Sequence, residues 1–224
     1  MSYPLVRPYI TYEELSRLPS DGHRYEFFDG EAYVSPSPSL WHQDVLVNLL
    51  LAFRAAAQGV ARVYIAPADV VLGPATVPQP DLVMVLNEHA SILSDVIRGA
   101  PDLVLEVLSP STAAVDRGLK METYARHGIP EYWIADGERQ AIEVYRLDRA
   151  AGAYRLMATY RRGDRATTPL LPDQGALRQE ARSTSGSGRG DGGGVQIRAR
   201  GLQETPPLAD QPGHVGRIDF GIRH

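Results

Sequence analysis

Two nearly continuous apolar runs, at residues 82–86 and 103–108, constrain the fold of this 224-residue chain most strongly. Runs of this kind are typical of strands that are covered on both faces of a sheet, because a strand with one wet face alternates apolar and polar residues. The second run contains a single carboxylate, Glu106. Burying an unpaired carboxylate is costly, so Glu106 needs a partner. A metal ion shared with Asp81 is one candidate partner, and a buried arginine is another.

The rest of the sequence predicts an α/β fold in which a mixed sheet is flanked by helices. Thr11-Tyr-Glu-Glu14 is a capping box that starts a short helix, and Asp29-Gly30 is the strongest short hairpin signal. Ser39 can cap the next helix, which carries a buried stripe of leucines. We expect helices at residues 40–58 and 113–127, and further strands at residues 24–28, 31–34, 60–65, 70–72, 131–136, 141–147 and 154–160.

The composition excludes several classes of protein. The chain has no cysteine, which excludes disulfides and cysteine-ligated zinc or iron–sulfur centres. It has no apolar run of about 18 residues and no signal-peptide pattern, so we expect a soluble cytoplasmic protein without a membrane partner. The net charge of −4 argues against a protein that passively coats DNA.

The chain changes character after residue 172. Residues 176–224 contain ten glycines, one aromatic residue (Phe220) and no regular apolar period. Such a segment cannot bury enough apolar surface to offset the entropy of ordering it. We therefore expect a domain at residues 1–172 and a disordered, low-complexity tail at residues 173–224, for which a frameshift in the gene would account.

Three residues indicate a site that cuts phosphodiesters. Asp81 stands at the mouth of the first apolar run, Glu106 lies within the second, and Lys120, the single lysine beside 22 arginines, lies on the helix that follows. Two carboxylates can hold Mg²⁺, which retains several waters and accepts a phosphate oxygen. The ion lowers the pKa of a bound water, while the lysine can position that water and compensate charge on phosphorus. The simpler alternatives are structural carboxylates and a solvated helix lysine.

Other side chains are expected near these three. Tyr124 and Arg117 flank the lysine on the same helix face. His42 falls on the buried stripe of its helix, where it is either a core histidine or a site residue that contacts phosphate or orients a water. Glu26 is expected to form a salt bridge to Arg24 or Arg117, or else to act as an outer metal ligand.

Five ordered motifs resemble those of the Uma-type restriction endonucleases, a bacterial family of the PD-(D/E)XK nuclease superfamily. The resemblance covers residues 11–172. It rests on Arg24-Tyr-Glu-Phe-Phe-Asp-Gly-Glu31, Ser35-Pro-Ser-Pro38 with His42, Gln79-Pro-Asp-Leu82, Pro101-Asp-Leu-Val-Leu-Glu-Val-Leu-Ser-Pro-Ser-Thr112 and Gly128-Ile-Pro-Glu-Tyr-Trp133.

The resemblance implies a restriction-endonuclease-like core, Mg²⁺-dependent cleavage of nucleic acid, DNA in particular, and a homodimer as in many members. It implies that Asp81 and Glu106 are metal ligands, helped by the carbonyl of Val107, and that Mn²⁺ can substitute for Mg²⁺. The lysine that the superfamily carries two residues after the glutamate is Leu108 here. The resemblance suggests that Lys120 has taken over its role.

The predicted catalytic residues are therefore Asp81, Glu106 and Lys120, and the predicted accessory residues are His42, Glu26 and Tyr124. The alternative is a nuclease fold without activity that serves as a binding or regulatory module, since no basic groove is evident in the sequence. Convergence of the three catalytic side chains in an accessible cavity would favour the enzyme. A Gly-x-Ser-x-Gly elbow is absent, which argues against an esterase.

Overall fold

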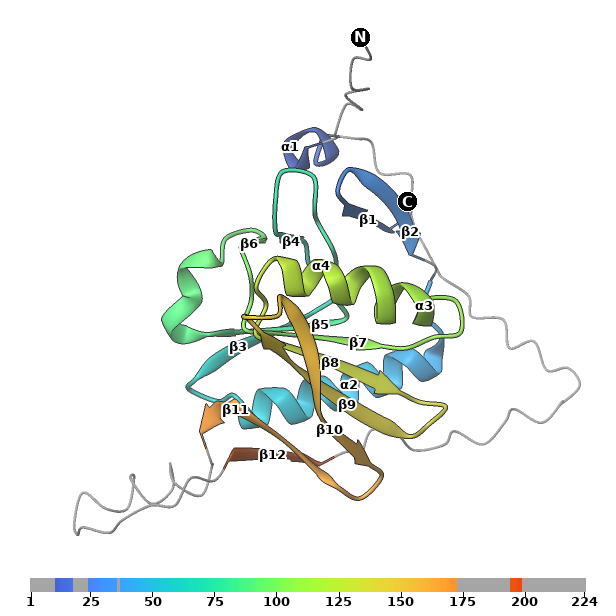
Figure 1. Cartoon of the computed structure of the whole chain (residues 1–224), viewed down its shortest axis with the longest axis vertical. Helices are drawn as coiled ribbons and strands as arrows, with labels where there is room; N and C mark the ends of the chain where they lie inside the picture. Colours follow the sequence, from blue (N-terminus) through green and yellow to red (C-terminus); the bar gives the residue numbers. More distant parts are fainter. Residues whose placement is uncertain (1–10, 18–23, 36, 173–193, 199–224) are drawn as a thin grey trace, which may run out of the picture.

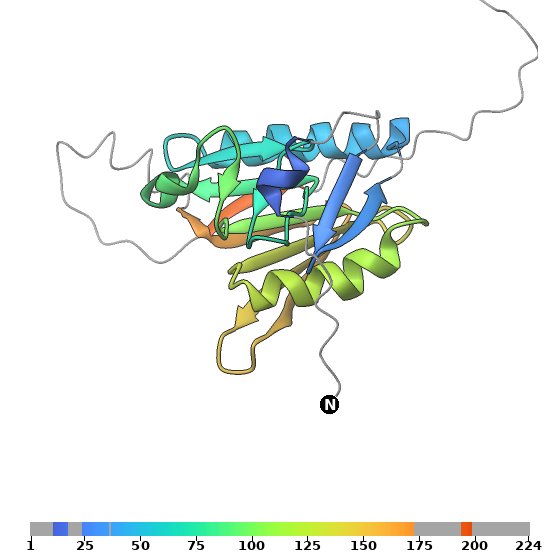
Figure 2. The same ribbon diagram turned by 90° about the horizontal axis from the view of Figure 1, so that it is seen from above.

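The computed structural model describes residues 11–17, 24–35, 37–172 and 194–198, and it has the predicted α/β architecture (Figure 1). A mixed sheet lies between helices on its two faces, as Figure 2 shows from above. Within the described residues, no helix is both long and apolar enough to cross a membrane.

Six strands form the central sheet in the order β10-β9-β8-β7-β5-β3. Neighbouring strands are antiparallel except β7 and β8, which run parallel. A parallel pair needs a crossover connection, and the helical segment between β7 and β8 supplies it. The six strands are β3 (Ala61–Ile65), β5 (Leu82–Leu86), β7 (Leu103–Val107), β8 (Glu131–Asp136), β9 (Ala141–Asp148) and β10 (Ala153–Arg161).

The predicted Asp-Gly hairpin is confirmed and forms a separate small sheet. β1 (Arg24–Phe28) pairs antiparallel with β2 (Glu31–Ser35). The turn residues Asp29 and Gly30 have φ of 51° and 84°, and such left-handed conformations explain why this dipeptide favours tight hairpins. The other short elements of this part of the chain are β4 (Val70–Val71), η1 (Asn87–Ile92) and β6 (Ile97–Arg98).

Helices cover the two faces of the central sheet. α2 (Leu40–Ala56) starts at Ser39, whose side chain accepts a hydrogen bond from the backbone N–H of His42. α3 (Ala113–Val115), a π-helical turn labelled η2 (Asp116–Lys120) and α4 (Met121–Arg126) follow one another without a break on the opposite face. The short helix α1 (Tyr12–Leu15) begins with the predicted capping box.

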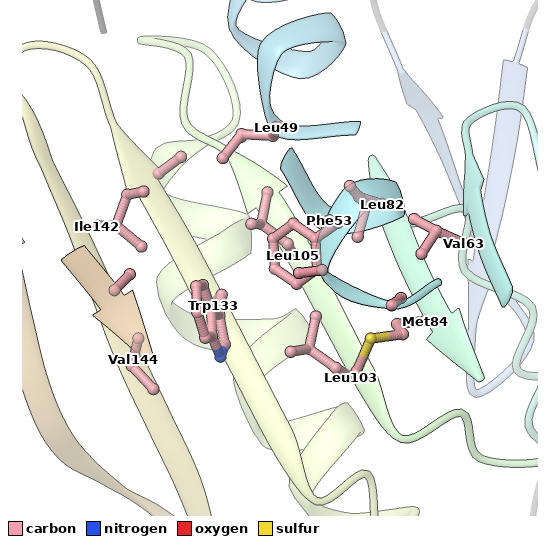
Figure 3. Packing of buried hydrophobic residues seen from close by; sticks show 14 of the residues in the cluster. Leu49, Phe53, Val63, Leu82, Met84, Leu103, Leu105, Trp133, Ile142 and Val144 are labelled. Carbon is pink, nitrogen blue, oxygen red and sulfur yellow. The ribbon is translucent and has the colours of Figure 1, made fainter. Parts of the chain in front are cut away.

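Successive side chains of the buried strands point to opposite faces of the sheet, where one apolar layer packs against α2 and the other against α4. In β5, Leu82 and Met84 pack in the layer of α2, whereas Val83 packs in the layer of α4. Figure 3 shows the α2 layer, where the rings of Phe53 and Trp133 meet edge to face with centroids 5.3 Å apart. The two apolar runs are therefore strands buried on both faces, as predicted.

The chain departs from the predicted elements in its last described part. β11 (Arg165–Pro172) follows β10, and β12 (Gly194–Arg198) pairs with it antiparallel, although no regular structure was expected beyond residue 172. Val195 and Ile197 alternate with polar residues in the sequence, which is the period of a strand, but the glycine-rich surroundings hide so short a signal. The rest of the predicted tail lies outside the described residues.

Candidate active site

Glu106 lies on the face of β7 that meets the helical segment. Val104 and Leu108, two residues away on either side, belong to the same packing layer as Tyr124. Glu106 is 2% exposed. Its Oε1 accepts one hydrogen bond from Lys120 Nζ at 3.0 Å and another from the Tyr124 hydroxyl at 2.8 Å. Within the protein, the partner that this buried carboxylate required is thus a lysine with a tyrosine, and not an arginine.

Asp81 lies directly beside Glu106 because the antiparallel register of β5 and β7 pairs Leu82 with Leu105. The Asp81 N–H donates to Oε2 of Glu106 at 3.3 Å. In return, Asp81 Oδ2 accepts a hydrogen bond from the Val107 N–H at 2.8 Å. The backbones of two adjacent strands therefore hold the two carboxylates next to each other.

His42 reaches the same place from the first turn of α2. Its Nε2 lies 3.1 Å from Asp81 Oδ2. Its Nδ1 is buried and has no hydrogen-bond partner among the described residues. Of the two interpretations of this residue, the contact with Asp81 supports the one in which it faces the site.

Lys120 is buried among carboxylates, with 4% of its surface exposed. Besides Glu106, its Nζ lies 3.2 Å from Glu26 Oε1 and 3.4 Å from Asp116 Oδ1. The interpretation of this residue as a solvated helix lysine is therefore wrong. The ammonium is the counter-ion of three carboxylates, and Asp81 adds a fourth acid to the group.

Burial and the neighbouring charges shift the pKa of the individual acids. Burial raises the pKa of Glu106 well above its usual value, while the Lys120 ammonium opposes this rise and the Asp81 charge adds to it. Burial also raises the pKa of Asp116. Burial acts in the same direction on Asp81, but hydrogen bonding and charge, first of all from His42, outweigh it and lower this pKa. A cation that binds here would relieve the repulsion among the ionised acids.

Glu26 holds the lysine in place from the hairpin. Its Oε1 also accepts the Gln79 N–H at 2.9 Å, and its Oε2 accepts a hydrogen bond from a serine hydroxyl of β2 at 2.8 Å. Glu26 therefore forms a salt bridge, as predicted, but its partner is Lys120 and not Arg24 or Arg117.

Lys120 is the last residue of a π-helical turn that begins at Asp116, and these two residues contact each other. The i→i+5 hydrogen bonding of this turn widens the helix, and Asp116, four residues earlier, faces the lysine. Arg117 instead donates to Asp136 at 3.0 Å and contacts Glu143. The sequence analysis missed Asp116, although the spacing of four residues between an acid and a lysine was a signal that could have found it.

A cavity of about 330 Å³ gives access to these groups. Asp81, Glu106 and Lys120 all line it, together with Glu26 from the hairpin and His42 from α2. The convergence that favours an enzyme over a non-catalytic module is therefore present in the structure.

The donor set fits a divalent cation held by two carboxylates. In the described part of the chain, no group of three or more His, Cys, Asp or Glu side chains is arranged to hold a metal ion. Asp81 and Glu106 are nevertheless adjacent, Val107 lines the cavity beside them, and no described residue donates a hydrogen bond to Oδ1 of Asp81. Because Mg²⁺ commonly uses one or two carboxylates together with waters and substrate phosphates, two suffice.

Comparisons with known proteins agree with the fold and the motifs. A family model described as "Uma2: Putative restriction endonuclease" matches residues 12–179. An uncharacterized protein of Synechocystis sp. is 28% identical over 149 residues, which cover 64% of this chain and 75% of the relative. The crystal structure of a "putative nuclease belonging to DUF820" from Anabaena variabilis shares the fold, with a TM-score of 0.59 and 20% identity over 71% of this chain and 88% of that one. The chain belongs to this family, Uma2, because the matched residues make up more than half of its length.

Proposed function

We propose that this chain is a metal-dependent endonuclease that hydrolyses phosphodiester bonds in DNA, with Asp81, Glu106 and Lys120 as its catalytic residues. The observation that carries the proposal is the meeting of these three side chains in one cavity. Glu106 joins the other two, since one of its oxygens accepts from Lys120 and the other from the Asp81 N–H. Burying several acids around one ammonium is costly for a structural scaffold, so a function in the cavity is the better account. Family membership supports nuclease chemistry.

Asp81 and Glu106 would hold Mg²⁺ or Mn²⁺ with help from the carbonyl of Val107. When bound, the ion would supply Lewis-acid stabilisation of the phosphate and a lowered pKa for the attacking water. Among the described residues that line the cavity, the arginine and lysine side chains are Arg24 and Lys120, and the ammonium of Lys120 is already surrounded by carboxylates.

The side chains around the two carboxylates have separate tasks. Lys120 keeps positive charge beside the reacting phosphate and can donate one N–H to the attacking water. Tyr124 holds Glu106 through its hydroxyl at 2.8 Å, and Glu26 holds Lys120 at 3.2 Å. His42 would orient Asp81, whose Oδ2 lies 3.1 Å from its Nε2.

The test is to incubate the purified chain with supercoiled plasmid, single-stranded circular DNA and RNA, each in Mg²⁺, in Mn²⁺ or in EDTA. We expect the plasmid to be nicked and then linearised with either metal, and to stay intact in EDTA. Cleavage of RNA alone would show that the assignment to DNA is wrong. If none of the three nucleic acids is cut with metal present, the proposal fails.

A second readout does not depend on activity. Mn²⁺ should raise the melting temperature of the wild-type chain, because it binds the folded state. Asp81→Asn and Glu106→Gln should abolish this rise and leave the metal-free protein as stable as before or more stable, since each removes one of the crowded charges. If Mn²⁺ raises the melting temperature of both variants as much as that of the wild type, Asp81 and Glu106 do not bind the metal.

A further inference from the structure

Two cavities meet beside the carboxylates. The cavity of about 330 Å³ that holds the site borders a second cavity of about 760 Å³. Arg24, Pro38, His42 and Asp81 line both of them. A polymer that places one bond at Asp81 can therefore extend in two directions from this junction.

Both cavities are poor in positive charge. In the smaller one, three carboxylates already surround the ammonium of Lys120, and Asp81 is a fourth acid in the lining. Among the described residues, Arg24 is the other lysine or arginine that lines the smaller cavity, and it is the only one that lines the larger. Because a phosphodiester backbone brings one negative charge for each nucleotide, a strand in this cleft needs a cationic contact.

Arg24 has a donor that no described residue of the chain satisfies. Arg24 and Glu26 lie two residues apart in β1, so their side chains point to the same face of the strand. The oxygens of Glu26 are nevertheless bound to Lys120, to the Gln79 N–H and to a serine hydroxyl. Nε of Arg24 is buried and has no hydrogen-bond partner among the residues that the structure describes. A buried donor without a partner is unfavourable, and an anionic ligand would satisfy it.

We propose that Arg24 is a substrate-binding residue whose guanidinium holds a backbone phosphate of the nucleic acid at the junction of the two cavities. This inference rests on the proposed endonuclease function and deepens it, because it names the contact that positions the strand beside Asp81 and Glu106. The guanidinium is suited to this task, since its planar fork matches two oxygens of a phosphate.

The test measures binding without cleavage. A fluorescein-labelled oligonucleotide, single-stranded or duplex, is titrated in EDTA with the wild-type chain and with Arg24→Gln, Arg24→Lys and Arg62→Gln, at several salt concentrations. Arg62 is the matched control because it is exposed on β3 and lines neither cavity. Arg24→Gln should weaken binding about tenfold, the size of one lost charge-assisted contact. It should also reduce the slope of log affinity against log salt by about 0.7–0.9, the value for one phosphate contact.

The conservative variant separates charge from geometry. Arg24→Lys should keep the wild-type salt slope and recover only part of the affinity, because it retains the charge without the fork. Arg62→Gln should match the wild type in affinity and slope. In the cleavage assay, Arg24→Gln should raise KM more than it lowers kcat.

The possible failures are distinguishable. If the wild type cuts DNA but Arg24→Gln has the same affinity and salt slope, the Arg24 inference is overturned and the proposed function stands. If Arg24→Gln melts many degrees lower while its folded fraction binds normally, Arg24 is structural and the inference is again overturned. If the wild type neither binds nor cuts nucleic acid, the proposed function falls and this inference falls with it.

Discussion

Nζ of Lys120 lies 3.0 Å from Oε1 of Glu106, so the single lysine of the chain forms a buried ion pair with the one acidic residue of strand β7. Lys120→Met should therefore destabilise the fold, because it leaves Glu26, Glu106 and Asp116 without their counter-ion. We expect a loss of about 3–5 kcal/mol, the usual result of removing one partner of a buried pair. Urea denaturation measures it, and adding Glu26→Gln to the variant should restore part of the loss. A variant as stable as the wild type would show that the acids do not depend on the lysine.

Lys120→Arg tests lysine chemistry without removing the charge. The site is buried, so the larger guanidinium should cost about 1–3 kcal/mol of stability through overpacking. Plasmid cleavage should fall on the order of a hundredfold, because the wider group cannot take the same position beside phosphate and water. The melting temperature should still rise with Mn²⁺, which serves as the control for an intact metal site. Cleavage at the wild-type rate would refute the role given to Lys120.

Gly137 allows the start of α2 to approach the sheet. A Cβ at this position would lie 1.9 Å from Cη2 of Trp41, the residue next to His42. Gly137→Ala should therefore displace the indole, lower stability by about 1–3 kcal/mol and reduce cleavage by moving His42 away from Asp81. Gly118→Ala is the control, since a Cβ there meets nothing within 4 Å. Equal urea midpoints for the two variants would contradict this account.

The pairing of Arg117 with Glu143 should make stability depend on pH. Burial acts to raise the pKa of Glu143, but hydrogen bonds from Arg117 and Tyr145 outweigh it and the pKa is lowered. A lowered carboxyl pKa means that the stabilisation is present above the unfolded value near 4.5 and is lost as pH falls through the folded value. Glu143→Gln should thus be less stable than the wild type by about 1–2 kcal/mol near neutral pH.

The same comparison in acid provides the check. The difference between Glu143→Gln and the wild type should shrink as pH falls below 4.5 and through the lowered pKa of Glu143, because the wild-type carboxyl then becomes protonated as well. Glu138→Gln is the matched control, since Glu138 is exposed in the turn beside Asp136. Urea midpoints that differ by the same amount at both pH values would mean that the charge of Glu143 contributes nothing.

The strand β12 gives the segment after residue 172 a structural role that can be measured. A chain that ends after residue 172 lacks β12, the antiparallel partner of β11. It should fold, because the six strands of the central sheet remain, but it should melt lower by about 2–4 °C for each kcal/mol lost. A chain that ends after residue 198 keeps the pairing and serves as the control. If the two truncated chains melt at the same temperature, β12 adds nothing to stability.

The three central residues of the site could be predicted from the sequence, because each lies at or next to an element that the apolar pattern indicates. Asp81 directly precedes the apolar strand β5, Glu106 lies in the apolar strand β7, and Lys120 follows in the helical segment after β7. When those two strands pair and the helical segment packs on them, the three side chains lie close together. Tyr124 was found for the same reason, since it lies one turn further along that helix.

The remaining features depended on geometry that residue spacing alone does not express. Arg117 contacts Asp136 from the π-helical turn instead of staying beside Lys120, and no pattern in the sequence predicts such a turn. The unpaired Nε of Arg24 could not be predicted from the sequence, because it depends on which other groups bind the oxygens of Glu26. In the same way, β12 is a strand only because β11 lies beside it.

The most direct measurement of the central claim is the rate at which the protein nicks supercoiled plasmid in Mn²⁺, compared between the wild type, Glu106→Gln and Glu88→Gln. Glu88 is the matched control, since it is an exposed glutamate of η1 that lines neither cavity at the site. We predict that Glu88→Gln cuts at the wild-type rate and that Glu106→Gln falls by on the order of a hundredfold or more, to the level of the wild type in EDTA. Nicking by Glu106→Gln at the wild-type rate, or wild-type nicking that persists in EDTA, would contradict metal-dependent cleavage at Asp81 and Glu106.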